Sequence, residues 1–124
     1  NKYFGTRLAA TQEIVSECKD LYFLPIGDIV LKGKTLPVTL FNPVTEEFYK
    51  DIFATKYLEC YKNLKNENLE IIESSDKENI INKNKAGNSM IKLSNDFPDE
   101  PLAKFHAKRI KKGLITTRVV MTDK

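Results

Sequence analysis

Residues 21–41 read Leu-Tyr-Phe-Leu-Pro-Ile-Gly-Asp-Ile-Val-Leu-Lys-Gly-Lys-Thr-Leu-Pro-Val-Thr-Leu-Phe, and this stretch decides the fold. It contains two apolar runs, Ile29–Leu31 and Leu36–Phe41, with Gly33 between them. Apolar, β-branched runs separated by a few residues that include glycine are typical of a β-hairpin, because glycine adopts the positive φ that such turns often require. We therefore predict an antiparallel hairpin here.

The two strands of this hairpin have recognisable limits. Tyr22–Ile26 and Asp28–Leu31 predict one long strand with a break near Pro25–Gly27. Pro37 has no N–H group, so we expect the second strand to be paired on one side only around that residue. We expect it to end at Asn42-Pro43, because proline disfavours further pairing.

A shorter strand and a helix are predicted before the hairpin. Thr6–Ala10 is short and apolar enough for a strand. Thr11 follows as an N-cap residue, whose hydroxyl can accept a hydrogen bond from the first turn of a helix. We expect that helix to cover Gln12–Cys18, with its apolar residues on one side.

An apolar stripe after the hairpin predicts a helix of about five turns that begins beyond Thr45, which suits an N-cap. The stripe recurs at spacings of three and four: Tyr49, Phe53, Tyr57, Cys60, Tyr61 and Leu64. Such a stripe most often packs in a core or against another helix. As an alternative, five of its side chains form a candidate interaction face: Tyr49, Phe53, Tyr57, Tyr61 and Leu64.

The last part of the chain alternates weak and strong helix signals. Asn66–Asn88 is rich in Asn and Lys, and because Asn lowers helix propensity we expect a loop that becomes a weak helix near Met90. Asp99 is the expected N-cap of a further helix that runs to about Lys112. Thr116–Thr122 predicts a short final strand.

The fold class predicted is therefore α+β, with short antiparallel strands followed by a helical part and a short C-terminal strand. We divide the chain into 1–43 and 44–124, because the pattern changes at Pro43 from one typical of strands to one typical of helices. The chain begins with Asn rather than Met, so we expect a piece of a longer protein.

Composition narrows the function classes. The chain has 124 residues, of which 41% are hydrophobic and 30% charged, as in ordinary soluble domains. No apolar run approaches the length that crosses a bilayer. The net charge of +3 is too small to imply nucleic acid by itself. Cys18 and Cys60 form no metal-like or redox pair, so we expect reduced thiols and a cytoplasmic location.

The hairpin resembles the end of the catalytic domain of class III adenylate and guanylate cyclases. The family pattern is a Gly, a strand, Lys-Gly-Lys, a small residue, a short gap with Pro and a closing apolar strand. The matching residues here are Gly27, Asp28–Leu31, Lys32-Gly33-Lys34, Thr35, Pro37 and Val38–Phe41. Upstream, Asn1–Arg7 is similar to the Asn-Lys-x-x-Gly-Thr turn of the family, although Leu8-Ala9-Ala10 is less β-branched than its usual sequel.

The second half is similar to the helical extension that follows the catalytic domain in many bacterial members of that family. The matching residues are Phe97–Pro101, Phe105-His106, Arg109, Gly113 and Thr117–Val120. The helices also look like one tetratricopeptide-type unit, and a single unit of this kind needs another surface to bury its apolar face. The resemblance thus implies 1–43 as the end of a ferredoxin-like cyclase sheet and 44–124 as the extension.

The resemblance also implies an activity and its partners. The full enzyme would convert ATP to cyclic AMP and pyrophosphate with Mg or Mn, as a homodimer, and its metal-binding and transition-state residues would lie upstream of Asn1. The chain alone would then bind no metal and be inactive. The family assigns a phosphate contact to Lys32, and Lys34 of the same turn is the second candidate. Whether ATP or GTP is the substrate, and whether the parent is attached to a membrane, stay open.

Two other function classes remain as alternatives. The helical part could be a non-catalytic protein-interaction module that uses the stripe defined above. The basic side of the last helix could bind nucleic acid or an acidic lipid surface, but it lacks interleaved aromatic residues, and a solvated face is the simpler interpretation. His106, the single histidine, has no nucleophile or carboxylate placed with it by any pattern, so we expect a packed residue.

Overall fold

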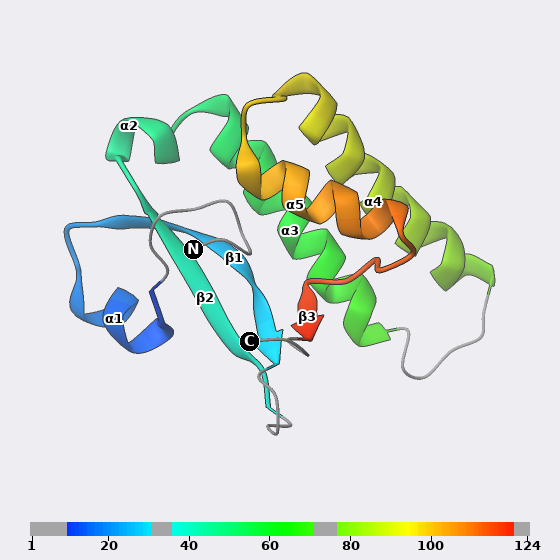
Figure 1. The fold of residues 1–124 in the computed structure, drawn as a ribbon, viewed down its shortest axis with the longest axis horizontal. Coiled ribbons are helices and arrows are strands. Elements are labelled where there is room, and N and C mark those ends of the chain that lie inside the picture. Colours follow the sequence, from blue (N-terminus) through cyan, green and yellow to red (C-terminus); the bar gives the residue numbers. More distant parts are fainter. Residues whose placement is uncertain (1–9, 31–35, 71–76, 121–124) are drawn as a thin grey trace.

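The computed structural model describes residues 10–30, 36–70 and 77–120, with 66–70 and 77–84 described by their backbone alone. Short elements come first: helix α1 (Gln12–Glu17), strands β1 (Tyr22–Val30) and β2 (Val38–Val44), and helix α2 (Glu46–Tyr49). Three longer helices and a short strand follow: α3 (Ile52–Glu70), α4 (Lys77–Asp96), α5 (Pro101–Lys111) and β3 (Arg118–Val120). Helices α3, α4 and α5 lie together on one side of the strands (Figure 1).

The antiparallel pairing predicted for the two strands of the hairpin is confirmed, while the turn predicted around Gly33 lies outside the described residues. Strands β1 and β2 pair antiparallel, and the register shifts between Pro25 and Gly27, where the sequence predicted a break. Strand β3 pairs with β1 in parallel, so the strand order in the described sheet is β2-β1-β3. The α+β class and the final strand are therefore confirmed, whereas parallel pairing of that strand was not predicted.

The predicted end of the second strand at Asn42-Pro43 is wrong, because β2 continues to Val44, which pairs with Tyr22. Backbone geometry explains why the proline is tolerated. Phe41 exchanges both of its backbone hydrogen bonds with Ala10, at 2.8 Å each, on the outer edge of β2. Alternation along a strand turns the nitrogen of Pro43 to the same outer edge, so β1 loses no hydrogen bond.

The single five-turn helix predicted after Thr45 is divided in two. The Thr45 cap is confirmed, since its hydroxyl accepts a hydrogen bond from the Phe48 N–H at 3.1 Å. Helix α2 then ends at Tyr49, and the carboxylate of Asp51 accepts a hydrogen bond from the Ile52 N–H at 2.8 Å, where α3 begins. A side chain that binds nearby backbone in this way competes with a continuous helix.

For Asn66–Asn88 we predicted a loop followed by a weak helix near Met90. The helix near Met90 is confirmed, but the described part of the predicted loop is largely helical. Helix α3 continues to Glu70 and α4 begins at Lys77. Tertiary packing outweighs the weak local propensity of this segment, because α4 buries Ala86, Met90 and Leu93 against its neighbours. Residues 71–76 lie outside the part of the chain that the structure describes.

The helix predicted to begin after Asp99 is confirmed, with its N-cap shifted by one residue. Helix α5 begins at Pro101, so Glu100 rather than Asp99 occupies the N-cap position. Gly113 follows the helix with φ at +91°, as expected of a glycine that ends a helix. The strand predicted over Thr6–Ala10 lies outside the described residues except for Ala10. Cys18 and Cys60 are both free thiols.

One apolar core joins the strands to the helices. It includes Leu24, Ile26 and Ile29 of β1, Val119 of β3, and buried side chains of α3, α4 and α5. Side chains from both sides of residue 43 thus fill the same interior, while the division at that residue and the tetratricopeptide likeness stay predictions. No helix in the described ranges is both long and apolar enough to cross a membrane.

Candidate functional site

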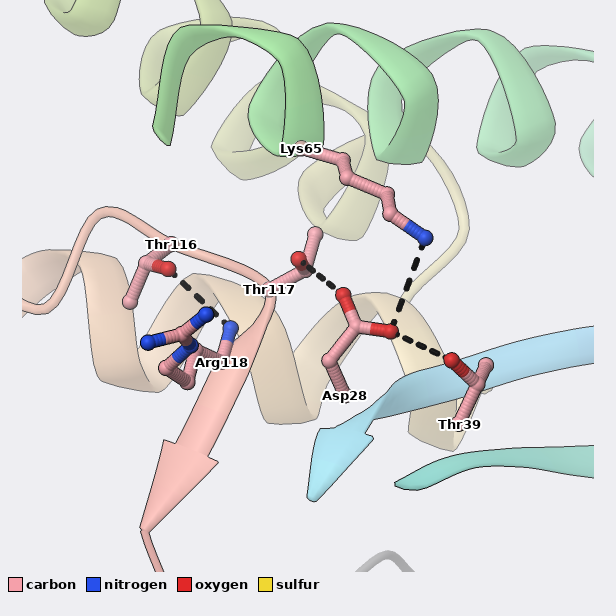
Figure 2. Close-up of polar contacts among 6 residues, drawn as sticks. All are labelled: Asp28, Thr39, Lys65, Thr116, Thr117 and Arg118. Atoms are coloured by element: carbon pink, nitrogen blue, oxygen red, sulfur yellow. Dashed lines mark hydrogen bonds and ion pairs between the residues drawn. The ribbon is translucent and has the colours of Figure 1, made fainter. Parts of the chain in front are cut away.

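The most distinctive polar feature is a buried carboxylate on the central strand. Asp28 lies on β1 just after the bulge and is only 8% exposed. The Thr39 hydroxyl on β2 donates a hydrogen bond to Asp28 Oδ1 at 2.6 Å, and the Thr117 hydroxyl donates to Oδ2 at 2.7 Å. Figure 2 shows the carboxylate between these two hydroxyls, which come from opposite sides of β1. We call Asp28, Thr39, Lys65 and Thr117 the Asp28 cluster.

The carboxylate also has a cationic neighbour and a backbone partner. Lys65 of α3 places its Nζ 3.7 Å from Asp28 Oδ1, but its side chain is 49% exposed, so solvent screens this ion pair. The Asp28 N–H donates to the Thr117 carbonyl at 2.8 Å. Burying a carboxylate is costly unless it is hydrogen-bonded and paired, and Asp28 meets both conditions.

The β-bulge supplies a second set of contacts to the helices. A bulge leaves its extra residue without a partner in the ladder, and Ile26 has no counterpart in the register with β2. His106 Nε2 of α5 lies 2.7 Å from the Ile26 carbonyl, and the Tyr57 hydroxyl of α3 donates to the Pro25 carbonyl. The bulge therefore presents two carbonyls that α3 and α5 satisfy.

Burial keeps these aromatic groups neutral. It raises the pKa of the Tyr57 and Tyr61 hydroxyls well above their usual value, with nearby Asp28 adding to the effect at Tyr61. Burial also lowers the pKa of His106 from 6.5 to about 4. A carbonyl only accepts hydrogen bonds, so neutral His106 carries its proton on Nε2 and donates it to Ile26.

Burial of these side chains limits the reactions in which they could take part, because a substrate in solvent cannot reach them. Among the described residues, His106 Nδ1 has no hydrogen-bond partner and is buried. A base in the interior cannot reach a substrate in solvent. Within the described ranges, no three His, Cys, Asp or Glu side chains are grouped so that they could hold a metal ion. The arrangement instead joins β1, β2, β3, α3 and α5.

The residues predicted from the sequence fall into three groups. Lys32 and Lys34 lie outside the described residues, so their phosphate contact stays a prediction. Of the candidate interaction face, the four side chains on α3 are at most 5% exposed and pack in the core of this chain: Phe53, Tyr57, Tyr61 and Leu64. Tyr49 is half-buried, with its ring 5.1 Å from that of Tyr22. The prediction that the stripe is core, and that His106 is packed, is confirmed.

Sequence reasoning missed the Asp28 cluster. Its one available signal was a charged residue inside an apolar strand, Ile26–Val30, which calls for a buried partner. The partners come from residues 39, 65 and 117, and no local pattern links these positions. Comparison with known proteins adds no guide: no family model, curated protein or solved structure matches the chain.

Proposed function

We propose that this chain is the C-terminal part of a class III nucleotide cyclase, whose complete catalytic domain converts ATP to cyclic AMP and pyrophosphate. The observation that carries the proposal is the contact between Thr117 and Asp28. These two residues belong to the two separate stretches that resemble the family, the strand before Lys-Gly-Lys and the C-terminal ending. Their side chains are 2.7 Å apart, and the Asp28 N–H is bonded to the Thr117 carbonyl.

Other residues of the resemblance also meet. His106 of the Phe-His pair lies against the Ile26 carbonyl, and Arg109 Nη2 donates to the Arg118 carbonyl at 2.7 Å. Gly27 lies where an added Cβ would be 3.3 Å from the Thr117 carbonyl, so glycine suits the close approach of the C-terminal segment. Two stretches that match one family in order, and that also contact each other, support the proposal more than either does alone.

Under this proposal the chain contributes structure and substrate contact rather than catalysis. Lys32 and Lys34 follow β1 directly in sequence, and a lysine is a flexible cation with three donors that suits a triphosphate. The metal ligands and the residues that stabilise the transition state belong to the upstream part of the proposed enzyme. The active form would be a homodimer, and we assign no metal to this chain.

The alternative, a protein-interaction module built on the helical part, has less support. It relied on the apolar stripe of α3, and that stripe packs against the chain's own strands and helices. A partner would have to displace the core to reach Phe53 or Tyr57. We therefore prefer the cyclase proposal.

The direct test measures cyclic AMP formed from ATP with Mn²⁺, comparing this chain with one extended upstream by about 150 residues. We expect product only from the extended chain, and cyclic GMP from GTP is measured in parallel. Cyclic AMP from the short chain would contradict the assignment of catalytic residues upstream. A folded extended chain that forms neither cyclic nucleotide would overturn the proposal.

The phosphate contact is tested in the same extended chain. We expect Lys32→Ala to raise the KM for ATP by about tenfold, the loss of one charge-assisted contact. Lys112→Ala is the matched control, since it removes an exposed lysine beyond the end of α5. An unchanged KM in the Lys32→Ala enzyme would remove this residue from the site.

A further inference from the structure

A pocket of about 270 Å³ opens at the end of β2 that lies furthest from Thr39 and the Asp28 cluster. Its walls come from the last residues of β2, from α2 and from the first turns of α3 and α5. These elements meet at one end of the molecule (Figure 1). Ligand pockets in proteins run upward from about 300 Å³, so this volume suits a small group rather than a large cofactor.

Most of the pocket wall is apolar and aromatic. Val44 of β2, Phe48 of α2 and Leu102 of α5 line it together with Phe53 of α3. The rings of Phe48 and Phe53 have their centroids 5.8 Å apart and are tilted by 50°, so they form a corner rather than a flat stack. The faces of aromatic rings attract cations that come within about 6 Å of the ring centroid.

One carboxylate lines the pocket, that of Glu100 at the N-cap position of α5. It makes no capping hydrogen bond to the first turn of the helix, and no lysine or arginine in the described ranges forms an ion pair with it. Partial burial, with Asp99 and Asp51 nearby, raises the pKa of Glu100. The surroundings therefore disfavour the negative charge, and a cation in the pocket would stabilise it.

Two other ligand classes fit the pocket less well. The first turn of a helix attracts anions, but Pro101 has no N–H to offer, and Glu100, Asp99 and Asp51 would repel a negative charge. Divalent metal ions require several oxygen ligands, and within the described ranges no three His, Cys, Asp or Glu side chains are grouped for that purpose. An ammonium group that carries hydrocarbon matches both the carboxylate and the aromatic wall.

We propose that this pocket is a binding site for an alkylammonium group, with its nitrogen beside the Glu100 carboxylate and its carbon atoms against Phe48 and Leu102. The group belongs either to a free amine or to a lysine side chain of a partner protein, and the recognition chemistry is the same for both. This site does not depend on the cyclase proposal, because the pocket shares no residue with the Asp28 cluster or with the Lys-Gly-Lys turn.

The test titrates this chain with n-butylammonium chloride and follows the amide signals of Phe48 and Leu102 by NMR. The neutral probe is 1-butanol, which has the same shape without the charge. We expect a Kd of about 1 mM for butylammonium, and binding of 1-butanol that is at least about tenfold weaker.

A substitution of the carboxylate then locates the site. Glu100→Gln keeps the shape of the side chain and removes its charge, and we expect it to weaken butylammonium binding about tenfold. Binding of 1-butanol should stay within about twofold of the wild-type value. Glu47→Gln is the matched control, because it removes an exposed charge of α2 that does not line the pocket, and we expect a change of less than about twofold.

A second variant tests the aromatic wall. Phe48→Leu keeps an apolar side chain without the ring, and we expect butylammonium to bind about threefold more weakly. This variant decides if Glu100→Gln fails to fold. Nα-acetyl-lysine N-methylamide distinguishes the two sources of the ligand. If it binds at least as tightly as butylammonium, a protein side chain is the source, and weaker binding identifies a free amine; either result supports the site.

The remaining outcomes decide the proposal. A preference for butylammonium over 1-butanol that is lost in Glu100→Gln and kept in Glu47→Gln supports it. No binding of butylammonium at about 10 mM overturns it, as does equal binding of the two probes. Equal weakening in Glu100→Gln and Glu47→Gln also overturns it, because the attraction would then belong to the acidic surface in general.

Discussion

The two edges of β1 are bound by different means. On one edge, β2 follows β1 after a short connection and pairs with it from Tyr22↔Val44 to Ile29↔Val38. On the other edge, β3 comes from beyond all of the long helices and pairs over three residues only. The first edge is a local antiparallel pair, and the second is a parallel contact between a strand near the beginning of the described chain and one at its end.

This difference teaches how a short, distant strand is held. A hairpin closes a small loop and needs little beyond its ladder, whereas closing a long loop costs more entropy, which β3 cannot recover from three residue pairs alone. Side chains supply the remainder. The Thr117 hydroxyl donates a hydrogen bond to Asp28, the Arg109 guanidinium donates one to the Arg118 carbonyl, and Val119, which is 8% exposed, packs in the core. The parallel edge should therefore be the more sensitive to single substitutions.

The largest expected effect is acid destabilisation of the junction between β1 and α5. His106 has its pKa lowered to about 4 in the folded chain against 6.5 when unfolded, so the unfolded state takes up the proton first as the pH falls. The free energy of unfolding should therefore drop by about 3 kcal/mol between pH 6.5 and 4 from this residue alone. Urea unfolding across this range measures the drop.

His106→Gln isolates that contribution from the carboxylates that also titrate in acid. Glutamine can still donate to the Ile26 carbonyl but does not ionise. As the pH falls, the free energy of unfolding should decrease more steeply in wild type than in His106→Gln. Equal pH slopes in the two proteins would mean that His106 is not buried as a neutral group.

The next effect distinguishes the two faces of β3. Val119→Ala removes buried methyl groups from the core, and we expect it to lower the free energy of unfolding by about 2 kcal/mol. Val120→Ala is the matched control, since Val120 is 59% exposed and should change stability by less than about 0.5 kcal/mol. Similar losses from both substitutions would argue that β3 is not docked as described.

The smallest effect tests the hairpin edge. Pro43→Ala should lower the free energy of unfolding by at most about 1 kcal/mol, mainly by loosening the unfolded chain, because the nitrogen of Pro43 faces away from β1. Thermal or urea unfolding of the variant provides the value. A change of several kcal/mol in either direction would place that nitrogen on the β1 side of the ladder.

Some of this molecule could be predicted from local patterns because the physics that forms those elements is local. The hairpin follows from two apolar runs around a glycine, and the bulge follows from Pro25 and Gly27 within one run. The cap at Thr45 and the glycine after α5 are similarly short-range features. Only the part of helix α4 near Met90 could be predicted, because the Asn-rich first half has weak helix propensity and the helix is stabilised by the burial of Ala86, Met90 and Leu93.

The candidate site could not be predicted from the sequence either, because its contacts join residues that are far apart in the chain. Asp28 stands alone as a charge in an apolar strand, but Thr39, Lys65 and Thr117 are ordinary residues in their own neighbourhoods. The apolar stripe of α3 could be read as core or as a partner surface, and only packing against β1, α4 and α5 decides that its side chains lie inside.

By itself, the sequence determined the α+β class, the antiparallel pairing of the two strands before Thr45, and a C-terminal strand. Tertiary structure alone decided that β3 runs parallel to β1 and that Asp28 receives hydroxyls from both neighbours. The physical reason is that turn chemistry and periodicity act over a few residues. A buried carboxylate, in contrast, must find its partners wherever the folded chain brings them.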